Sequence, residues 1–185
     1  MLALALFWLA VAVIVYVYVG FPLMIWLRAL LRPRPYQQAE LTPPVSLVIA
    51  AYNEERDIVD KLENILALDY PRDRLQVIVA SDGSTDATNA LVAPYAERYP
   101  HIQFLALPRQ GKARALNDAV AAATGDILVF SDGNSQYAAS AIRELTRPFA
   151  DPAVGGVAGN QRYLSSQGSD GAGEKSYWSF DRQLK

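Results

Sequence analysis

Gly125-Asp126-Ile127-Leu128-Val129-Phe130-Ser131-Asp132-Gly133-Asn134-Ser135 is an apolar run that ends abruptly in a polar turn. A short run that is rich in Ile, Val and Phe and follows a glycine is typical of a fully buried strand in a parallel sheet. In open α/β sheets, ligands bind beyond the carboxyl ends of the strands. The stretch therefore predicts a buried strand whose end presents Asp132 and Asn134 to a ligand.

The side chains of Asp132 and Asn134 suggest that this ligand includes a divalent cation. Both offer hard oxygen atoms of the kind that Mg²⁺ or Mn²⁺ binds together with substrate phosphates and water. Asn contributes only a neutral carbonyl, so the pair predicts a metal that is held jointly with a diphosphate. A helix-capping turn is the alternative interpretation of the same residues.

Three further apolar runs precede this one, and each leads into polar residues and then into a helix-prone segment. The predicted strands are 45–51, 75–80 and 102–107, and 154–159 is a possible further strand. The first predicted helix starts near Asn53, which is expected to act as its N-cap, and stops before Pro71. The other predicted helices cover 87–99, 112–124 and 138–149. This alternation predicts an α/β fold in which a mostly parallel sheet carries helices on both faces.

Right-handed crossovers would bring the polar residues at the strand ends to one edge of the sheet. Asp82 lies in an Asp-Gly-Ser turn, where we expect an exposed carboxylate, although this tripeptide is also an ordinary turn. Lys112 follows Gly111 at a helix N-terminus, where free backbone N–H groups favour phosphate. The spacing of a P-loop is missing, because Ala106 and Ala113 occupy positions that this motif requires to be Gly and Ser or Thr.

The first third of the chain has a different character. Leu2 to Leu27 contains no charged residue, and Arg28, Arg32 and Arg34 follow directly. The run is long enough to cross a bilayer, and the positive-inside rule then places the rest of the chain in the cytoplasm. We expect a transmembrane helix over 1–31, a proline-punctuated linker over 32–44 and a folded domain over 45–185. A secretory signal peptide is the alternative for the N-terminal run.

Composition excludes several classes of function. The chain has 17 Lys and Arg against 19 Asp and Glu, a formal net charge of −2, which provides no basic field for binding nucleic acid. Cysteine is absent, so disulfides, thiolate metal sites and cysteine nucleophiles are excluded, in agreement with a reducing compartment.

Four motifs resemble, in this order and spacing, those of family 2 glycosyltransferases with the GT-A fold. They lie at residues 45–55, 81–86, 111–117 and 129–134, and the resemblance extends over 45–185. It implies transfer of a sugar, with inversion, from a nucleotide diphosphate donor, expected to be a UDP-sugar, to a hydroxyl of a saccharide or lipid-linked acceptor. The resemblance further implies that the reaction belongs to polysaccharide or glycolipid synthesis at the cell membrane. The expected cofactor is Mg²⁺ or Mn²⁺.

The resemblance also implies which residues bind the donor. Tyr52, Glu54 and Asp82 would line the pocket for the base and ribose, Lys112 would lie near the base or the diphosphate, and Asp132 would bind donor and metal. Asn134 would be the second metal ligand, although it departs from the family's Asp-x-Asp pattern. The substrate-binding residues expected on this basis are Ala51, Tyr52, Glu54, Asp82, Gly83, Lys112 and Asp132.

The catalytic residue stays unknown at this point. In the family, the base that deprotonates the acceptor is an Asp in a later motif, and a Gln-x-x-Arg-Trp motif follows it. Neither is present in this sequence, so we expect the base beyond Lys185, after a segment at 174–178 that resembles Glu-x-x-Tyr-Trp. A noncatalytic nucleotide-sugar-binding or scaffold protein and a nucleotidyltransferase are the alternatives.

Overall fold

The structure is a computed structural model that describes residues 1–32 and 35–160. The chain divides into two compact units, and Met1–Pro35 and Tyr36–Gly159 belong to different ones. The predicted segment at 174–178 lies outside the described residues, as do residues 33 and 34 of the predicted linker. The rest of that linker, residues 35–44, contains no helix or strand.

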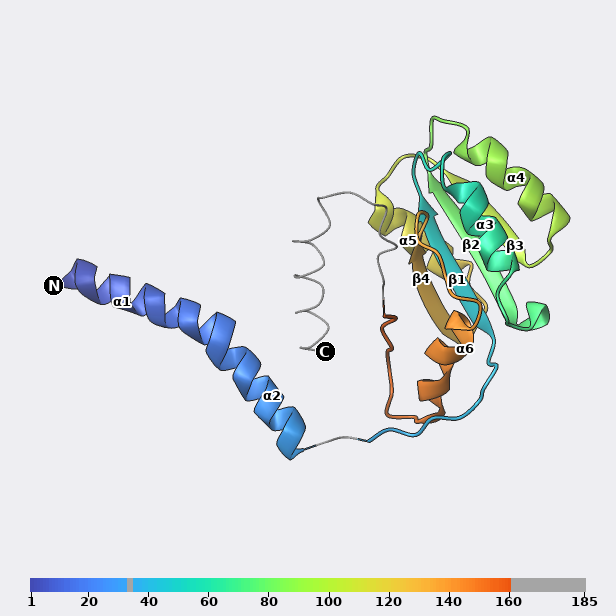
Figure 1. Ribbon diagram of the computed structural model, residues 1–185. Helices are drawn as coiled ribbons and strands as arrows, with labels where there is room; N and C mark the ends of the chain where they lie inside the picture. Colours follow the sequence, from blue (N-terminus) through green and yellow to red (C-terminus); the bar gives the residue numbers. More distant parts are fainter. Residues whose placement is uncertain (33–34, 161–185) are drawn as a thin grey trace, which may run out of the picture. The chain divides into compact units, whose positions relative to one another are not determined.

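The N-terminal unit is a helix from Leu2 to Leu31 (Figure 1). It consists of α1 (Leu2–Val15), a π-helical turn (Tyr16–Gly20) and α2 (Phe21–Leu31). Pro22 follows the turn and has no N–H with which to continue the α-helical hydrogen bonds, which explains the wider turn at this point. The 30 residues span about 45 Å, which is enough for the hydrocarbon core of a bilayer by length and composition.

The second unit is built on a four-stranded, fully parallel sheet. Its strands are β1 (Val45–Ala51), β2 (Leu75–Asp82), β3 (Ile102–Leu107) and β4 (Ile127–Asp132), in the spatial order β3-β2-β1-β4. The register aligns Val45 with both Leu75 and Ile127, so that the carboxyl ends of the strands meet at one edge. The predicted parallel α/β sheet is confirmed.

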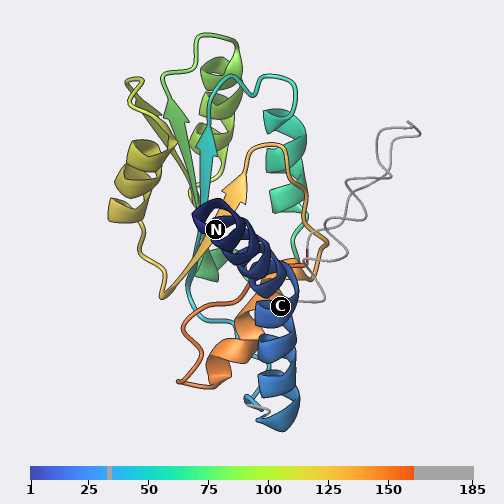
Figure 2. The same cartoon turned by 90° about the vertical axis from the view of Figure 1, so that its left-hand side faces the viewer.

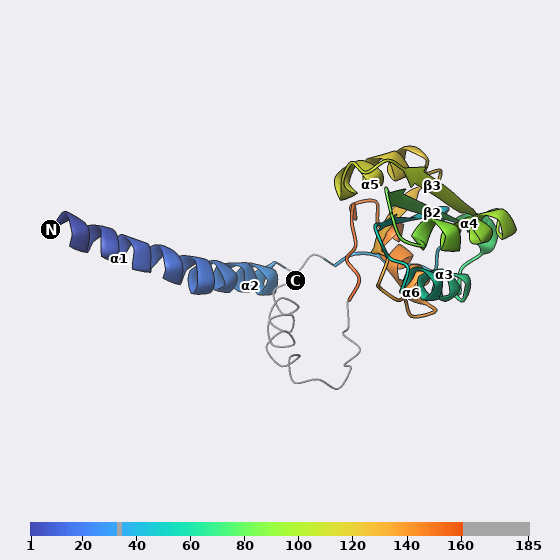
Figure 3. The same cartoon turned by 90° about the horizontal axis from the view of Figure 1, so that it is seen from above.

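Helices cover both faces of this sheet (Figures 2 and 3). α3 (Ile58–Leu66) and α4 (Thr88–Arg98) pack on one face, and α5 (Lys112–Ala121) packs on the other. The first face buries side chains such as Leu47, Val77 and Leu62, while the second buries Val48, Ile78 and Ala119. Short helical turns at Arg72–Arg74, at α6 (Ala141–Thr146) and at Arg147–Ala150 complete this unit.

The prediction that the 125–135 stretch contains a fully buried strand is wrong. Residues alternate along β4, and Leu128 and Phe130 are 37% and 56% exposed. β4 is an edge strand of the described sheet and pairs with β1. The helix on this face, α5, packs on β1 and β2 rather than on β4. Among the described elements, none covers the side of β4 from which these two side chains project.

Several predicted boundaries also need correction. Asn53 is not an N-cap, because α3 begins only at Ile58 and Asn53 adopts a left-handed conformation with φ of 54°. The prediction that this helix stops before Pro71 is confirmed, because α3 ends at Leu66, but α5 ends at Ala121 and not at Thr124. The predicted helix over 138–149 is a six-residue α6 followed by a 3₁₀ turn, and residues 154–159 form no strand.

Candidate active site

A cavity of about 290 Å³ opens at the carboxyl edge of the sheet. The register explains why the loops meet there, since Ala50 lies beside Asp132 on one side and Ala51 lies beside Ser81 on the other. The residues that line the cavity are Ala50, Ala51, Tyr52, Glu54, Asp82, Arg109, Lys112, Asp132, Gly133 and Asn134.

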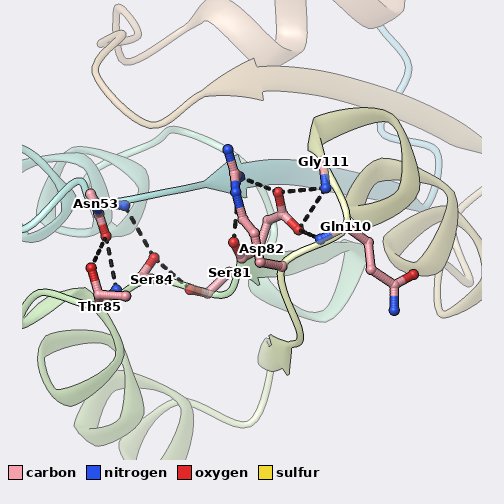
Figure 4. A network of polar contacts seen from close by, with 8 residues as sticks. Asn53, Ser81, Asp82, Ser84, Thr85, Gln110 and Gly111 are labelled. Atoms are coloured by element: carbon pink, nitrogen blue, oxygen red, sulfur yellow. Dashed lines mark hydrogen bonds and ion pairs between the residues drawn. The ribbon is translucent and has the colours of Figure 1, made fainter.

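Asp82, the last residue of β2, holds the loop that follows β3. Its carboxylate accepts hydrogen bonds from the backbone N–H groups of Gln110, at 2.7 Å, and of Gly111, and it pairs with the guanidinium of Arg109 (Figure 4). The Gln110 hydrogen bond, followed by that of Gly111 and the Arg109 charge, holds the pKa of Asp82 below its usual range despite burial. The expectation of an exposed carboxylate is therefore wrong, because Asp82 is only 2% exposed.

Gly83 allows the same loop to approach β2 closely. Its φ is +67°, and a Cβ atom at this position would lie 2.7 Å from the backbone nitrogen of Arg109. Only glycine fits such a conformation and approach without strain. Gly83 does not line the cavity, so its place in the site is to let Arg109 reach Asp82.

The loops after β1 and β2 are tied together in a similar way. The side-chain oxygen of Asn53 accepts a hydrogen bond from the backbone N–H of Thr85 at 2.9 Å, and the Asn53 N–H donates to Ser84 Oγ. Ser84 also pairs with Ser81 at the end of β2 (Figure 4). Asn53 thus serves as a bridge between loops, which places the neighbouring Tyr52 and Glu54 at the cavity.

Arg109 and Tyr52 form the aromatic wall of the cavity. The guanidinium carbon of Arg109 lies 3.5 Å from the centre of the Tyr52 ring, a cation–π contact. Arg109 is not among the donor-binding residues expected from the sequence. Its position directly after a predicted strand, in the same loop as Lys112, was the signal that could have identified it.

Asp132 and Lys112 form an ion pair across the mouth of the cavity. Lys112 is the first residue of α5, and its Nζ donates to Asp132 Oδ1 at the end of β4. Both side chains are almost two-thirds exposed, so the pair contributes little to stability. A bound cation can therefore replace Lys112 as the partner of Asp132, and a phosphate group can replace Asp132 as the partner of Lys112.

Glu54 is the third acidic residue at the cavity. Burial raises its pKa, and the negative charges of Asp57 and Asp132 raise it further, with Lys112 acting in the opposite direction. A Cβ atom at Gly133 would lie 3.2 Å from Glu54 Cγ, so the Glu54 side chain packs directly against the Asp132–Asn134 turn.

The structure thus brings together all of the proposed binding residues except Gly83, and adds Ala50, Arg109 and Gly133. Among residues 1–32 and 35–160, no group of three or more His, Cys, Asp or Glu side chains could hold a metal ion. A cation at Asp132 and Asn134 would need further ligands, such as the oxygen atoms of a bound substrate.

Comparison with known proteins identifies the family. Residues 46–183 match the model of glycosyl transferase family 2. The fold also matches a mannosyltransferase from Pyrobaculum calidifontis, solved in complex with GDP-Man and Mn²⁺, with 33% identity and a TM-score of 0.68. That match covers 82% of this chain and 46% of the mannosyltransferase.

Two curated relatives give a similar result. A beta-monoglucosyldiacylglycerol synthase from Synechocystis is 34% identical over 62% of this chain and 25% of its own length. A poly-beta-1,6-N-acetyl-D-glucosamine synthase from Staphylococcus aureus is 31% identical over 74% of this chain and 33% of its own length. The chain therefore spans a quarter to a third of these relatives. From the family model, the GT-A-like sheet and the shared motifs, the chain belongs to family 2 of the glycosyltransferases.

Proposed function

We propose that this chain provides the donor-binding domain of a membrane-anchored, inverting glycosyltransferase that uses a nucleoside diphosphate sugar. The main support is the convergence of Tyr52, Asp82 and Lys112 with Asp132 on one cavity, each from the end of a different strand or the loop after it. An ordinary set of turns would not require such polar and aromatic side chains to meet around an open space.

Mg²⁺ or Mn²⁺ fits the chemistry of this cavity as a joint ligand of protein and donor. Asp132 would supply a carboxylate and Asn134 an amide oxygen, and the diphosphate oxygens of the donor would complete the shell. When bound, the cation would supply positive charge to the departing nucleoside diphosphate. Lys112 would exchange Asp132 for a phosphate oxygen and stabilise the same charge.

The nucleoside would occupy the other end of the cavity. Tyr52 offers an aromatic face of the kind on which a base stacks, and Arg109 now lies over that face. Arg109 would therefore move aside or stack on the base when the nucleotide binds. Asp82 would contribute mainly by fixing the loop of Arg109 and Lys112, with Glu54 nearer the ribose.

A UDP-sugar is the first candidate donor. GDP-mannose is the second, because the similar mannosyltransferase was solved with GDP-Man and Mn²⁺. The acceptor would be a hydroxyl of a lipid-linked or saccharide substrate, since the relatives are named as a glycolipid synthase and a poly-N-acetylglucosamine synthase. The base that deprotonates it would lie outside residues 36–159, where Asp151 is engaged in capping a turn at Ala153 and in binding Gln37 N.

The N-terminal helix would anchor the domain in the cell membrane. Arg28 and Arg32 at its C-terminal end favour a cytoplasmic location for the residues that follow. This location would also give the domain access to nucleotide sugars. A noncatalytic sugar-nucleotide-binding protein remains the alternative, but membership of a glycosyltransferase family favours the enzyme.

Isothermal titration of the full 185-residue chain in detergent tests the proposal. UDP-glucose, UDP-N-acetylglucosamine and GDP-mannose would be titrated with Mn²⁺ and with EDTA, against wild type and Asp132→Ala. We expect one nucleotide class to bind more tightly with Mn²⁺, and Asp132→Ala to remove the metal dependence. Binding to none of the three, or unchanged metal dependence in Asp132→Ala, would contradict the proposed site.

A further inference from the structure

Lys61 is a buried lysine on the face of α3 that packs against the sheet. It is 1% exposed, and its buried neighbours on the same helix are the apolar Ile58, Leu62 and Ile65. Removing an ammonium group from water costs several kcal/mol, even after the surrounding protein has adjusted. The position therefore requires compensating contacts.

Those contacts lie at the end of β4. Lys61 Nζ donates to Ser131 Oγ at 2.7 Å, to the backbone oxygen of Ser135 at 2.5 Å and to Ser135 Oγ at 3.1 Å. It also lies 4.2 Å from the centre of the Tyr137 ring. The three oxygen atoms are uncharged, and they match the three donors of an ammonium group.

These contacts enclose the turn that carries the candidate metal ligands. Ser131 precedes Asp132, and Ser135 follows Asn134, so that Lys61 holds both ends of the turn at once. Ser135 Oγ also donates to the backbone oxygen of Asp132 at 3.0 Å, which closes the turn further. Lys61 therefore binds the backbone and flanking side chains of the turn.

The alternation of side chains along β4 separates two lysines. Ser131 points to the face covered by α3, where it meets Lys61, while the next residue, Asp132, points to the other face and meets Lys112 of α5. Lys112 is exposed and can exchange partners, but Lys61 is enclosed and its contacts are fixed. At the same strand end, Lys112 is therefore available to bind a ligand, whereas Lys61 is available only to hold the turn.

We propose that Lys61 is a positioning residue, which fixes the Asp132–Ser135 turn in the shape that binds the metal and diphosphate of the donor. This inference rests on the proposed function. Burial lowers the pKa of Lys61 to about 8, and the charge of Asp132 opposes that decrease, so the side chain stays largely protonated at neutral pH. Its positive charge also partly offsets the negative charge of the turn.

The test compares Lys61→Met with Lys61→Arg in the full chain in detergent. Lys61→Met keeps an unbranched side chain of similar length but removes the charge and the donors. UDP and GDP would be titrated by calorimetry with Mn²⁺ and with EDTA, and thermal unfolding would be recorded without ligand. Hydrogen exchange of the ligand-free protein would report the mobility of the peptide that contains residues 131–137.

We expect Lys61→Met to weaken nucleotide binding with Mn²⁺ by about tenfold or more, which is typical when a residue that orients a metal ligand is lost. Binding with EDTA should stay within about twofold, because the base pocket is not touched. The peptide over 131–137 should exchange faster. The Tm should not fall, because the substitution also removes a buried charge. Lys61→Arg should restore much of the Mn²⁺-dependent affinity, since it keeps charge and donors.

Asn64→Ala is the matched control. Asn64 lies one turn further along α3 and binds both backbone groups of Tyr137: its Nδ2 donates to the Tyr137 oxygen at 2.9 Å, and its Oδ1 accepts from the Tyr137 N–H at 2.8 Å. Its loss should lower the Tm but leave the ratio of affinities with and without Mn²⁺ unchanged. An equal loss of metal-dependent binding in this control would overturn a specific part for Lys61.

The remaining outcomes separate the inference from the proposed function. If the wild-type chain binds neither nucleotide, the proposed function fails, and the inference fails with it. If wild type binds with metal dependence and Lys61→Met does the same, only the inference is overturned. Weaker binding without any change in exchange over 131–137 would also overturn it, because Lys61 would then act without positioning the turn.

Discussion

Gly111 donates its backbone N–H to both carboxylate oxygens of Asp82, at 3.0 and 2.9 Å. This arrangement connects the end of β2 to the first turn of α5, so the position of Lys112 depends on a carboxylate that lies on another strand. The buried carboxylate of Asp82 therefore fixes the loop that carries Lys112, so its loss should affect both folding and ligand binding.

Asp82→Asn should weaken nucleotide binding by about tenfold and lower the Tm by several degrees. The amide keeps one oxygen that can accept from the N–H groups of Gln110 and Gly111, but its NH₂ group would then face the Arg109 guanidinium, so the ion pair is lost and two donors oppose each other. Calorimetry and thermal unfolding of the full chain measure the two effects. Asp73→Asn is the control, because the Asp73 side chain is 82% exposed and lies in a surface turn.

The difference between wild type and Asp82→Asn should also depend on pH. The pKa of Asp82 is held below the ordinary value of 3.8 for this side chain, so the ionised carboxylate stabilises the folded state above that pH. This stabilisation is lost as the pH falls through the lower, folded-state pKa. Unfolding curves of both proteins should therefore converge in acid, and a constant difference down to that range would contradict the assignment.

Gly83→Ala should destabilise the domain and weaken donor binding together. A non-glycine residue at φ of +67° costs about 1–2 kcal/mol, and the new Cβ would lie too close to the backbone of Arg109. The loop of Arg109 must then shift away from Asp82. Urea unfolding measures the loss of stability, and nucleotide titration measures the loss of affinity that a shifted loop would cause.

Gly156→Ala provides the comparison for that variant. A Cβ at Gly156 would meet nothing within 4 Å, and the residue has no positive φ. Its free energy of unfolding should stay within about 0.5 kcal/mol of wild type. Equal stability of the Gly83 and Gly156 variants would show that the close approach at Arg109 does not matter.

The strand ends of the site could be predicted from the sequence, because each apolar run stops at a polar turn and parallel crossovers bring those turns to one edge. Tyr52, Lys112 and Asp132 were found in this way, and all three line the cavity. The positions of strands are determined by local composition, so this part of the fold needed no knowledge of long-range packing.

Burial of charged residues could not be predicted by the same means. Lys61 lies three residues after Ile58 and four before Ile65, on the apolar face of α3, but a lysine in such a pattern is normally taken as solvent-exposed. Asp82 is buried because a loop from beyond β3 folds over it. Both depend on contacts between residues far apart in the sequence, and the exposure of Phe130 depends on where α5 packs.

Lys112→Met should have opposite effects on free metal and on nucleotide. Without its partner, Asp132 would bind Mn²⁺ up to about fivefold more tightly, because an exposed ion pair contributes less than about 1 kcal/mol. Nucleotide binding in the presence of Mn²⁺ should weaken by about tenfold, since a charged hydrogen bond to phosphate is lost. Titrations of Mn²⁺ alone and of Mn²⁺ with UDP or GDP measure the two effects.

Lys112→Arg is the control for charge. It keeps a cation near Asp132 and the diphosphate, so both affinities should stay closer to wild type than in Lys112→Met. If Lys112→Met leaves nucleotide affinity unchanged, the proposed contact of Lys112 with the diphosphate is wrong, although its ion pair with Asp132 would stand.

Lys61 should make the stability of the domain depend on pH in the alkaline range. Its pKa in the folded chain is about 8, against 10.5 for the ordinary side chain, because burial disfavours the charged form. Between these values the unfolded chain binds more protons than the folded chain, so stability rises with pH. From pH 7 to pH 9.5 this single group should add about 2 kcal/mol to the free energy of unfolding.

Lys61→Met isolates this contribution, because other groups that titrate at alkaline pH are shared by both proteins. Tyr95, whose pKa is raised to about 12 by its hydrogen bond to Glu63, is one of them. The free energy of unfolding of wild type minus that of Lys61→Met, from urea unfolding followed by circular dichroism, should therefore increase by about 2 kcal/mol over this range. A difference that stays constant from pH 7 to pH 9.5 would contradict a lowered pKa of Lys61 in the folded chain.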